Sequence, residues 1–289
     1  MQKVIFKNNM GQSITLSNTR PFILEEIQNT GGVKSTLITT KAPYQDGKSY
    51  HGSVIEDRII PITGAIVGEN QKDIDIKKKE LCKIFNNKCY GELIYINNAG
   101  EYKIECVVES SPVFNEKKGI IQKFLIQLYC PSPYWSNIEE NNTEIALWSN
   151  DFEFPIEIQE EGINLGHRES NLIVNINNTG DVECGLRAEL KALATVKNPS
   201  IFNIGTREFI KVKKSLHAGD ILIISTEFAN KKVELLRGNG LKENVFNYIH
   251  VNSDFFKLVP GENLLRYDAE EGIDNLELSI FYKNLYLGV

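Results

Sequence analysis

IIQKFLIQLYCPSPYW, residues 120–135, separates the chain into two parts. Its first ten residues are apolar at nearly every position, which is typical of a long, mostly buried β-strand. Prolines then interrupt the strand, because proline lacks a backbone donor and forces the residue before it into an extended conformation. Polar residues 136–143 follow. We therefore predict two domains, 1–138 and 139–289, joined by a hinge whose residues are Cys130, Pro131, Pro133, Tyr134 and Trp135.

The overall composition indicates a folded protein with two domains. The chain has 289 residues, of which 42% are hydrophobic and 24% are charged, and this length suits two domains of ordinary size. Its apolar runs are all shorter than the 18 to 20 residues, roughly, that a membrane helix needs. Residues 1–9 do not resemble a signal peptide. We expect synthesis in the cytoplasm and no membrane association.

The five cysteines predict neither a metal site nor a redox motif. They are widely spaced and include no Cys-x-x-Cys pair, so buried free thiols are the simplest interpretation. No metal and no cofactor are expected.

Charge divides the chain at the same place. Residues 1–135 contain 17 Lys and Arg against 14 Asp and Glu, whereas residues 136–289 contain 15 against 24. A net charge of +3 therefore precedes a net charge of −9. The acidic second part argues against specific nucleic-acid binding.

The first part predicts a mostly antiparallel β-domain. Residues 4–6 and 13–16 read as a hairpin, and residues 33–40 as a strand. Residues 41–52 contain Pro, Asp-Gly and Gly, which indicates a long exposed loop or hairpin arm. Its two tyrosines, Tyr44 and Tyr50, suit contact with a partner better than a core.

One helix is expected in this domain. Asn70 or Asp73 caps its start, and an apolar stripe follows at Ile74, Leu81, Ile84 and Phe85. Residues 77–79 are three lysines, for which a solvated face is favoured over DNA contact. Residues 53–67 read as a strand broken at Pro61 and Gly64, and strands at 90–96 and 101–109 end at Pro112. A barrel-like sheet with the helix packed on it is the simplest closure.

The second part reads as an all-β sandwich. Candidate strands are 152–159, 171–177, 182–196, 202–212, 220–227, 231–236, 244–249, 254–259, 263–267 and 275–282, separated by turn signals. A jelly-roll-like β-sandwich is the expected architecture.

Motifs of known catalytic sites are absent from the sequence. Its acidic pairs, such as Glu160-Glu161, would point to opposite sides of a strand rather than across a glycosidic bond. The four histidines are scattered and fit no metal-binding spacing. Aromatic side chains of the second part offer a weaker alternative, a sugar-binding surface, from Tyr248, Phe255, Phe256, Tyr267, Phe281, Tyr282 and Tyr286.

In order and spacing, several short motifs resemble the distal tail protein family of long-tailed phages. They are Gly31-Gly32, Pro43-Tyr44-Gln45-Asp46-Gly47, Arg58-Ile59-Ile60-Pro61-Ile62-Thr63-Gly64, the helix end at 81–85 with Gly91-Glu92-Leu93, Phe124 with Cys130-Pro131-Ser132-Pro133-Tyr134-Trp135, Asn177-Asn178-Thr179-Gly180, and Phe256-Lys257-Leu258-Val259-Pro260-Gly261-Glu262-Asn263.

The resemblance implies a tail-tube-like first domain that closes into a hexameric ring, and a galectin-like sandwich outside it. It implies a structural hub at the tail tip, without enzymatic activity, whose partners are copies of itself, the tail tube protein and a tail-tip (tail-associated lysin-like) protein. Assembly would take place in the host cytoplasm, before the protein resides at the virion tail tip. We expect the ring-interface arm to use Tyr44, Gln45, Asp46 and Tyr50.

Two rival functions follow from the residues. One is a carbohydrate-binding adhesin whose sandwich recognises a host cell-wall polymer, although the length leaves no room for the inserted binding modules of some family members. The other, a wall hydrolase, is disfavoured because no catalytic motif is found.

Overall fold

In the computed structural model, which describes residues 2–145, 148–149, 167–168 and 172–289, the quoted stretch forms strands β9 (Ile121–Cys130) and β10 (Trp135–Asn137). The chain divides into unit 1, Met1–Ile138 with Leu285–Val289, and unit 2, Glu139–Asn284. The carboxyl end of the predicted second domain is therefore wrong, because its last five residues return to unit 1. The chain passes between the units twice.

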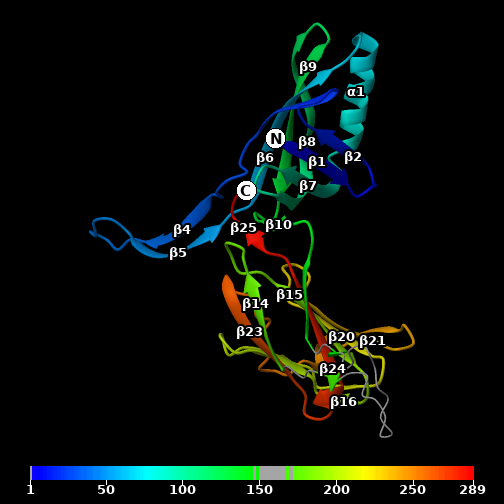
Figure 1. Cartoon of the computed structure of the whole chain (residues 1–289). Coiled ribbons are helices and arrows are strands. Elements are labelled where there is room, and N and C mark those ends of the chain that lie inside the picture. Colours follow the sequence, from blue (N-terminus) through cyan, green and yellow to red (C-terminus); the bar gives the residue numbers. More distant parts are fainter. Residues whose placement is uncertain (1, 146–147, 150–166, 169–171) are drawn as a thin grey trace. The chain divides into compact units, whose positions relative to one another are not determined.

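Unit 1 is a barrel-like sheet with one helix (Figure 1). Its strands run in the order β2-β1-β7-β8-β9-β6-β3, and a bridge between Ser17 and Ile23 brings β3 back to β2. The bounds are β1 Lys3–Asn8, β2 Ser13–Leu16, β3 Phe22–Ile27, β6 Arg58–Val67, β7 Tyr90–Ile96, β8 Glu101–Lys118 and β25 Leu285–Tyr286. The predicted hairpin of β1 with β2 and the barrel-like closure are confirmed.

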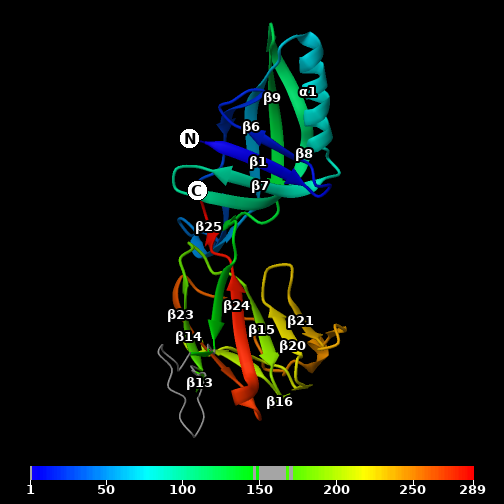
Figure 2. The ribbon, with the colours of Figure 1, turned by 45° about the vertical axis from the view of Figure 1, so that its right-hand side comes forward.

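The core of unit 1 lies inside this curved sheet, and the helix α1 (Gln71–Ile84) helps to close it (Figure 2). Asn70 caps α1 by accepting from the Asp73 amide, while Ile74, Leu81 and Ile84 are buried, as the sequence predicts. Phe85, just beyond the helix, stacks on Phe6 with ring centroids 4.5 Å apart. The stripe buries one side of α1 against the barrel strands.

Three expectations for the strands of unit 1 differ from the structure. β9, predicted to be mostly buried, is fully buried on one face only: Phe124, Ile126 and Leu128 are buried, but the alternate residues are exposed or half-buried, because the barrel's outer face meets solvent. Pro112 does not end β8, since register shifts around it allow the strand to continue to Lys118. The predicted breaks at Pro61 and Gly64 are also absent, because both residues lie within the continuous strand β6. β3 ends opposite Ile62, so the missing N–H of Pro61 leaves no carbonyl of β3 without a donor.

Unit 2 is a sandwich of two principal sheets. One sheet has the order β11-β24-β15-β20-β21-β22, and the other has the order β14-β23-β17-β18. Each buries alternate residues on one face, such as Leu276, Leu278 and Ile280 of β24, which is the pattern expected for a sandwich core. The Tyr282 hydroxyl in the first sheet donates to the Asn177 carbonyl in the second at 3.2 Å.

The bounds in unit 2 are β11 Asn141–Ile145, β12 Trp148–Ser149, β13 His167–Arg168, β14 Ile173–Asn178, β15 Leu186–Ala192, β16 Val196–Lys197, β17 Ser200–Asn203, β18 Phe209–Lys211, β19 Ser215–Leu216, β20 Ile221–Ser225, β21 Lys232–Leu236, β22 Lys242–Asn244, β23 Gly261–Asp268 and β24 Leu276–Tyr282. Short 3-10 helices η1 and η2 cover Phe246–Tyr248 and Ile273–Asn275. η1 replaces most of the strand predicted at 244–249. The one predicted at 254–259 reduces to a bridge between Leu258 and Cys184. The predicted strand 152–159 lies outside the described residues.

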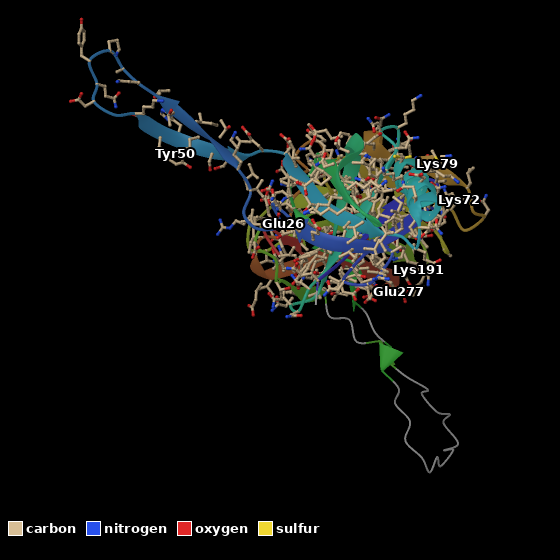
Figure 3. The ribbon with its side chains drawn as sticks, turned by 90° about the horizontal axis from the view of Figure 1, so that it is seen from above. Glu26, Tyr50, Lys72, Lys79, Lys191 and Glu277 are labelled. Carbon is tan, nitrogen blue, oxygen red and sulfur yellow. The ribbon has the colours of Figure 1, made fainter. Side chains whose placement is uncertain are left out.

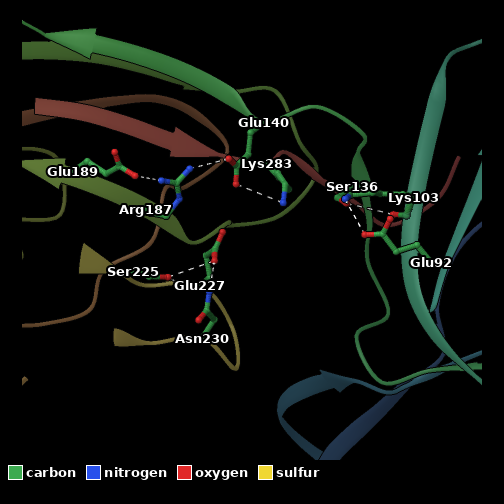
Figure 4. Close-up of polar contacts among 10 residues, drawn as sticks. All are labelled: Glu92, Lys103, Ser136, Glu140, Arg187, Glu189, Ser225, Glu227, Asn230 and Lys283. Atoms are coloured by element: carbon green, nitrogen blue, oxygen red, sulfur yellow. Dashed lines mark hydrogen bonds and ion pairs between the residues drawn. The ribbon is translucent and has the colours of Figure 1, made fainter. Parts of the chain in front are cut away.

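An ion-pair cluster links the first and last residues of unit 2. Glu140 accepts a hydrogen bond from Arg187 at 2.9 Å and pairs with Lys283 at 3.5 Å (Figure 4). Burial opposes the charge of Glu140, but these cations outweigh it and lower the pKa of Glu140 below its ordinary value. The segments that enter and leave unit 2 are thus held together on their own unit.

Among the helices of the described chain, none is both long and apolar enough to span a membrane.

Candidate functional site

The most exposed feature of unit 1 is a two-stranded arm, β4 (Ser35–Thr40) with β5 (Ser49–Ile55). These strands pair only with each other, and they extend away from the sheet of unit 1 (Figure 3). The arm is longer than the predicted range 41–52, because both strands belong to it. A lone two-stranded ribbon is marginally stable in water, and its outer edges offer unpaired backbone groups. The arm therefore exposes a surface that another chain can cover.

Apolar side chains lie on both faces of the arm. Leu37 and Tyr50 are 61% and 62% exposed, and Ile38 and Val54 are also exposed. The register pairs Leu37 with Ser53 and Thr39 with Tyr50, so Leu37 and Tyr50 share one face; Ile38 and Val54 share the other. A shift in register after Ile38 falls at Gly52, whose φ of 154° suits glycine. Leu37, Ile38 and Val54 were not expected from the sequence to be exposed, although each of them adjoins a serine or threonine.

At the tip of the arm, the predicted residues have different environments. Gln45 shapes the turn: its side-chain oxygen accepts from the Ala42 amide at 2.9 Å, and its amide donates to Ser49 at 3.3 Å. Tyr44, with a positive φ of 62°, directs a fully exposed ring into solvent. Asp46 is exposed beside it. Tyr44 and Tyr50 are therefore available to a partner, whereas Gln45 holds the tip in shape.

Arg58 anchors the root of the arm. Only 3% of Arg58 is exposed, and its guanidinium donates to four backbone carbonyls. Two belong to the segment before β4, Asn29 and Gly31 (2.8 Å for Gly31); the others are Pro133 at 2.9 Å and Leu287 at 2.5 Å. Burial lowers the pKa of Arg58, yet arginine remains charged at neutral pH. One buried cation thus ties three distant segments of unit 1 together.

The returning segment 285–289 completes this anchor. The Val289 amide donates to the Thr30 carbonyl at 3.0 Å, and β25 pairs with β10 through Trp135 and Tyr286. Gly288 lies so close to Gly31 that an added Cβ would stand 2.9 Å from the Gly31 Cα. Sequence reasoning missed Arg58. Its signal is a cation in an inward-facing position, followed by Ile60 and Ile62 on the same face of β6.

The predicted hinge residues lie inside unit 1, rather than at its boundary with unit 2. Cys130 ends β9 and Trp135 begins β10, and both are fully buried in the core; Pro131, Pro133 and Tyr134 connect the two strands. The Arg58 guanidinium carbon lies 5.9 Å from the centre of the Trp135 ring. The Cys130 thiol and burial both raise the pKa of Cys106, which keeps that thiol protonated. The hinge role remains a prediction, because the boundary itself falls after Ile138.

Two other kinds of site gain no support from the described residues. Phe256, Tyr267 and Tyr282 are buried, so three of the seven aromatic side chains considered for sugar binding belong to the core of unit 2. Tyr286 belongs to unit 1. Within the described ranges, no group of three or more His, Cys, Asp or Glu side chains is placed to hold a metal ion.

Two family models match the sequence. Residues 9–130 match the phage tail protein RIFT-related domain, and residues 179–286 match the siphovirus-type tail component, C-terminal domain. The first match falls in unit 1, and the second falls in unit 2 except for Leu285 and Tyr286, which belong to unit 1. No protein of curated function matches the chain.

Solved structures share the fold over the whole chain. The Dit (gp 19.1) protein of phage SPP1, described as a paradigm of the hub adsorption apparatus in phages that infect Gram-positive bacteria, is 12% identical, with a TM-score of 0.72 over 99% of each chain. A chain of the phage p2 baseplate in its activated conformation with Sr is 14% identical, with a TM-score of 0.57 over 100% of this chain and 99% of that one. The corresponding baseplate with Ca is 13% identical, with a TM-score of 0.56.

Proposed function

Because the chain belongs to the siphovirus-type distal tail protein family, we propose that it is the structural hub of a phage or phage-like tail tip. Copies of unit 1 form a hexameric ring, the number of copies expected from the sequence. This ring joins the tail tube protein to a tail-tip, tail-associated lysin-like protein. The protein assembles in the host cytoplasm and then resides at the virion tail tip. It has no catalytic activity, no cofactor and no specific nucleic-acid or membrane partner.

One observation carries this proposal: the β4–β5 arm exposes apolar side chains on both faces and unpaired backbone on both edges. The strands of the barrel are paired, so the arm concentrates the unsatisfied edges of unit 1. Such edges invite pairing with another chain, and a soluble protein normally covers them. A ring of copies, each covering the arm of its neighbour, provides that cover. Tyr44, Gln45, Asp46 and Tyr50 are the residues proposed for this contact.

Deletion of the arm tests the proposal. The Glu56 amide donates to the Lys34 carbonyl at 3.0 Å, so the two ends of the arm lie side by side. The dipeptide Asn-Gly can therefore replace residues 35–55. We expect a folded protein with a cooperative unfolding transition that elutes as a monomer and shows no rings in negative-stain images. The matched control, Phe228→Ser, changes an exposed ring of unit 2 and should leave the rings intact. Rings of the arm-deleted protein would refute the arm's role.

A further inference from the structure

Four apolar side chains form one row on the outer face of the barrel. Tyr90 of β7 is directly opposite Val107 of β8, Val107 is opposite Tyr129 of β9, and Tyr129 is opposite Ile59 of β6. Opposed residues lie on the same face of a sheet. Their neighbours Cys106, Cys130 and Arg58 are buried, so the row itself faces outward.

This row, Tyr90–Val107–Tyr129–Ile59, is accessible. Tyr90 is 64% exposed and Ile59 is 38% exposed, while Val107 and Tyr129 are half-buried. The side of an antiparallel sheet that faces solvent normally carries polar residues. Four adjacent strands that instead place an apolar side chain in one line provide a surface suited to an apolar partner.

Negative charge flanks the row. Glu105 and Glu109 lie on β8, two residues on either side of Val107, and both are exposed. Neither forms an ion pair with any described residue. Along β7, Glu92 pairs with Lys103 at 3.1 Å (Figure 4), so Glu105 and Glu109 are left as carboxylates beside the row without an ion pair among the described residues.

The arm carries the complementary features. Leu37 with Tyr50, and Ile38 with Val54, supply an apolar pair on each face. Lys41 and Lys48 flank the tip; both are exposed and make no ion pair within the described part of the chain. Residues 35–55 contain Lys41 and Lys48 against Asp46, a net charge of +1, so a weakly basic, apolar ribbon and an acidic, apolar row are present on the same unit. Charge complementarity of this kind sets the register and orientation of an interface.

We propose that the arm of one copy lies across the row Tyr90–Val107–Tyr129–Ile59 of the next copy. The donor and acceptor are different surfaces of one unit, so the contact is head-to-tail, and head-to-tail contacts generate a ring when the rotation closes. Lys41 and Lys48 then lie beside Glu105 and Glu109 of the neighbouring copy. This inference rests on the proposed ring and names the surface through which the ring closes.

A photo-crosslink tests the location of the contact. The full chain carries p-benzoylphenylalanine in place of Tyr50, is assembled and irradiated, and is then digested for mass spectrometry. We expect a cross-link between copies that joins residue 50 to a peptide containing residue 90, 107 or 129. The same photoreactive residue at Phe228 serves as the control and should give no cross-link to these peptides. Rings in which residue 50 is linked elsewhere would overturn the inference while leaving the hub function intact.

Charge reversal gives a second, independent readout. The double substitution K41E/K48E and the double substitution E105K/E109K should each weaken assembly about three- to tenfold, because like charges then face each other. The quadruple variant should recover most of this loss, measured as the ring fraction by native mass spectrometry at low salt. Absence of recovery in the quadruple variant would overturn the proposed pairing. A wild-type chain that forms no oligomer would instead contradict the proposed hub function.

Discussion

Arg58 and Leu287 are 229 positions apart in sequence, yet the Arg58 Nη2 atom donates a hydrogen bond to the Leu287 carbonyl at 2.5 Å. The same guanidinium holds the root of the arm through Asn29 and Gly31. The segment that returns from unit 2 is therefore fastened to the base of the arm by one side chain. Variants at this anchor should alter unit 1 in defined ways.

Arg58→Met should destabilise unit 1 by about 3–5 kcal/mol, because the substitution leaves buried carbonyls without donors. Arg58→Lys should be intermediate, since an ammonium cannot reach carbonyls from three segments at once. Urea unfolding at pH 7 measures both. Arg20→Met changes an exposed arginine of the same unit and should remain within about 0.5 kcal/mol of the parent protein. Equal effects at Arg58 and Arg20 would contradict the anchor.

Gly288→Ala should loosen the root of the arm without changing Arg58. The new Cβ would lie 2.9 Å from the Gly31 Cα, so one backbone must move. We expect trypsin to cleave faster after Lys34, at the root, while cleavage after Lys41, at the tip, keeps its rate. Gly31→Ala is the matched control, because a Cβ there meets nothing within 4 Å. Unchanged cleavage after Lys34 in Gly288→Ala would show that the close approach is not required.

Trp135→Ala should cost about 3–5 kcal/mol, since it empties a fully buried site in the core of unit 1. Trp135→Phe should cost clearly less. The indole Nε1 has no hydrogen-bond partner among the described residues, so phenylalanine removes no hydrogen bond and keeps most of the apolar contact. Differential scanning calorimetry can rank the two variants. A Trp135→Phe variant as destabilised as Trp135→Ala would contradict a mainly apolar role for the ring.

Asp220 makes unit 2 sensitive to acid. Burial opposes its ionisation, but the His217 and Gly238 amides and Arg237 outweigh burial and lower the pKa of Asp220. Since its folded pKa is depressed, its stabilisation is present above the ordinary aspartate pKa of about 3.9 and is lost as pH falls through the folded value.

Asp220→Asn should therefore destabilise unit 2 by about 1–3 kcal/mol at pH 7. In either orientation of the new side chain, its NH2 group would face an N–H that now donates to Asp220, and that hydrogen bond would be lost. The difference from the parent protein should shrink below about pH 4, as protonation removes the same charge. Urea titrations at pH 7, 5 and 3 test this. Glu270→Gln, at an exposed ion pair with Lys211, is the control and should cost less than Asp220→Asn at pH 7. A difference that stays constant down to pH 3 would exclude the assigned role.

Much of the fold follows from local sequence. The cap at Asn70 and the apolar stripe of α1 specify the helix, and strict alternation specifies β24 over Leu276–Tyr282. β9 shows the limit of this reasoning. Its outward residues Ile121, Leu125 and Tyr129 are apolar, which predicts a mostly buried strand, whereas the structure leaves that face partly open. Apolarity shows what a residue prefers and does not identify what covers it.

Propensity, periodicity and turn chemistry act over neighbouring residues, so they are enough to predict the β class, the one helix and an exposed arm containing Tyr44 and Tyr50. Only the tertiary structure brought Arg58 to Leu287, and only strand register aligned Tyr90, Val107, Tyr129 and Ile59 across four strands. These contacts join residues far apart in the chain, and they depend on how the sheet curls and which strands become neighbours. Local preferences do not encode that choice; burial of the common core makes it.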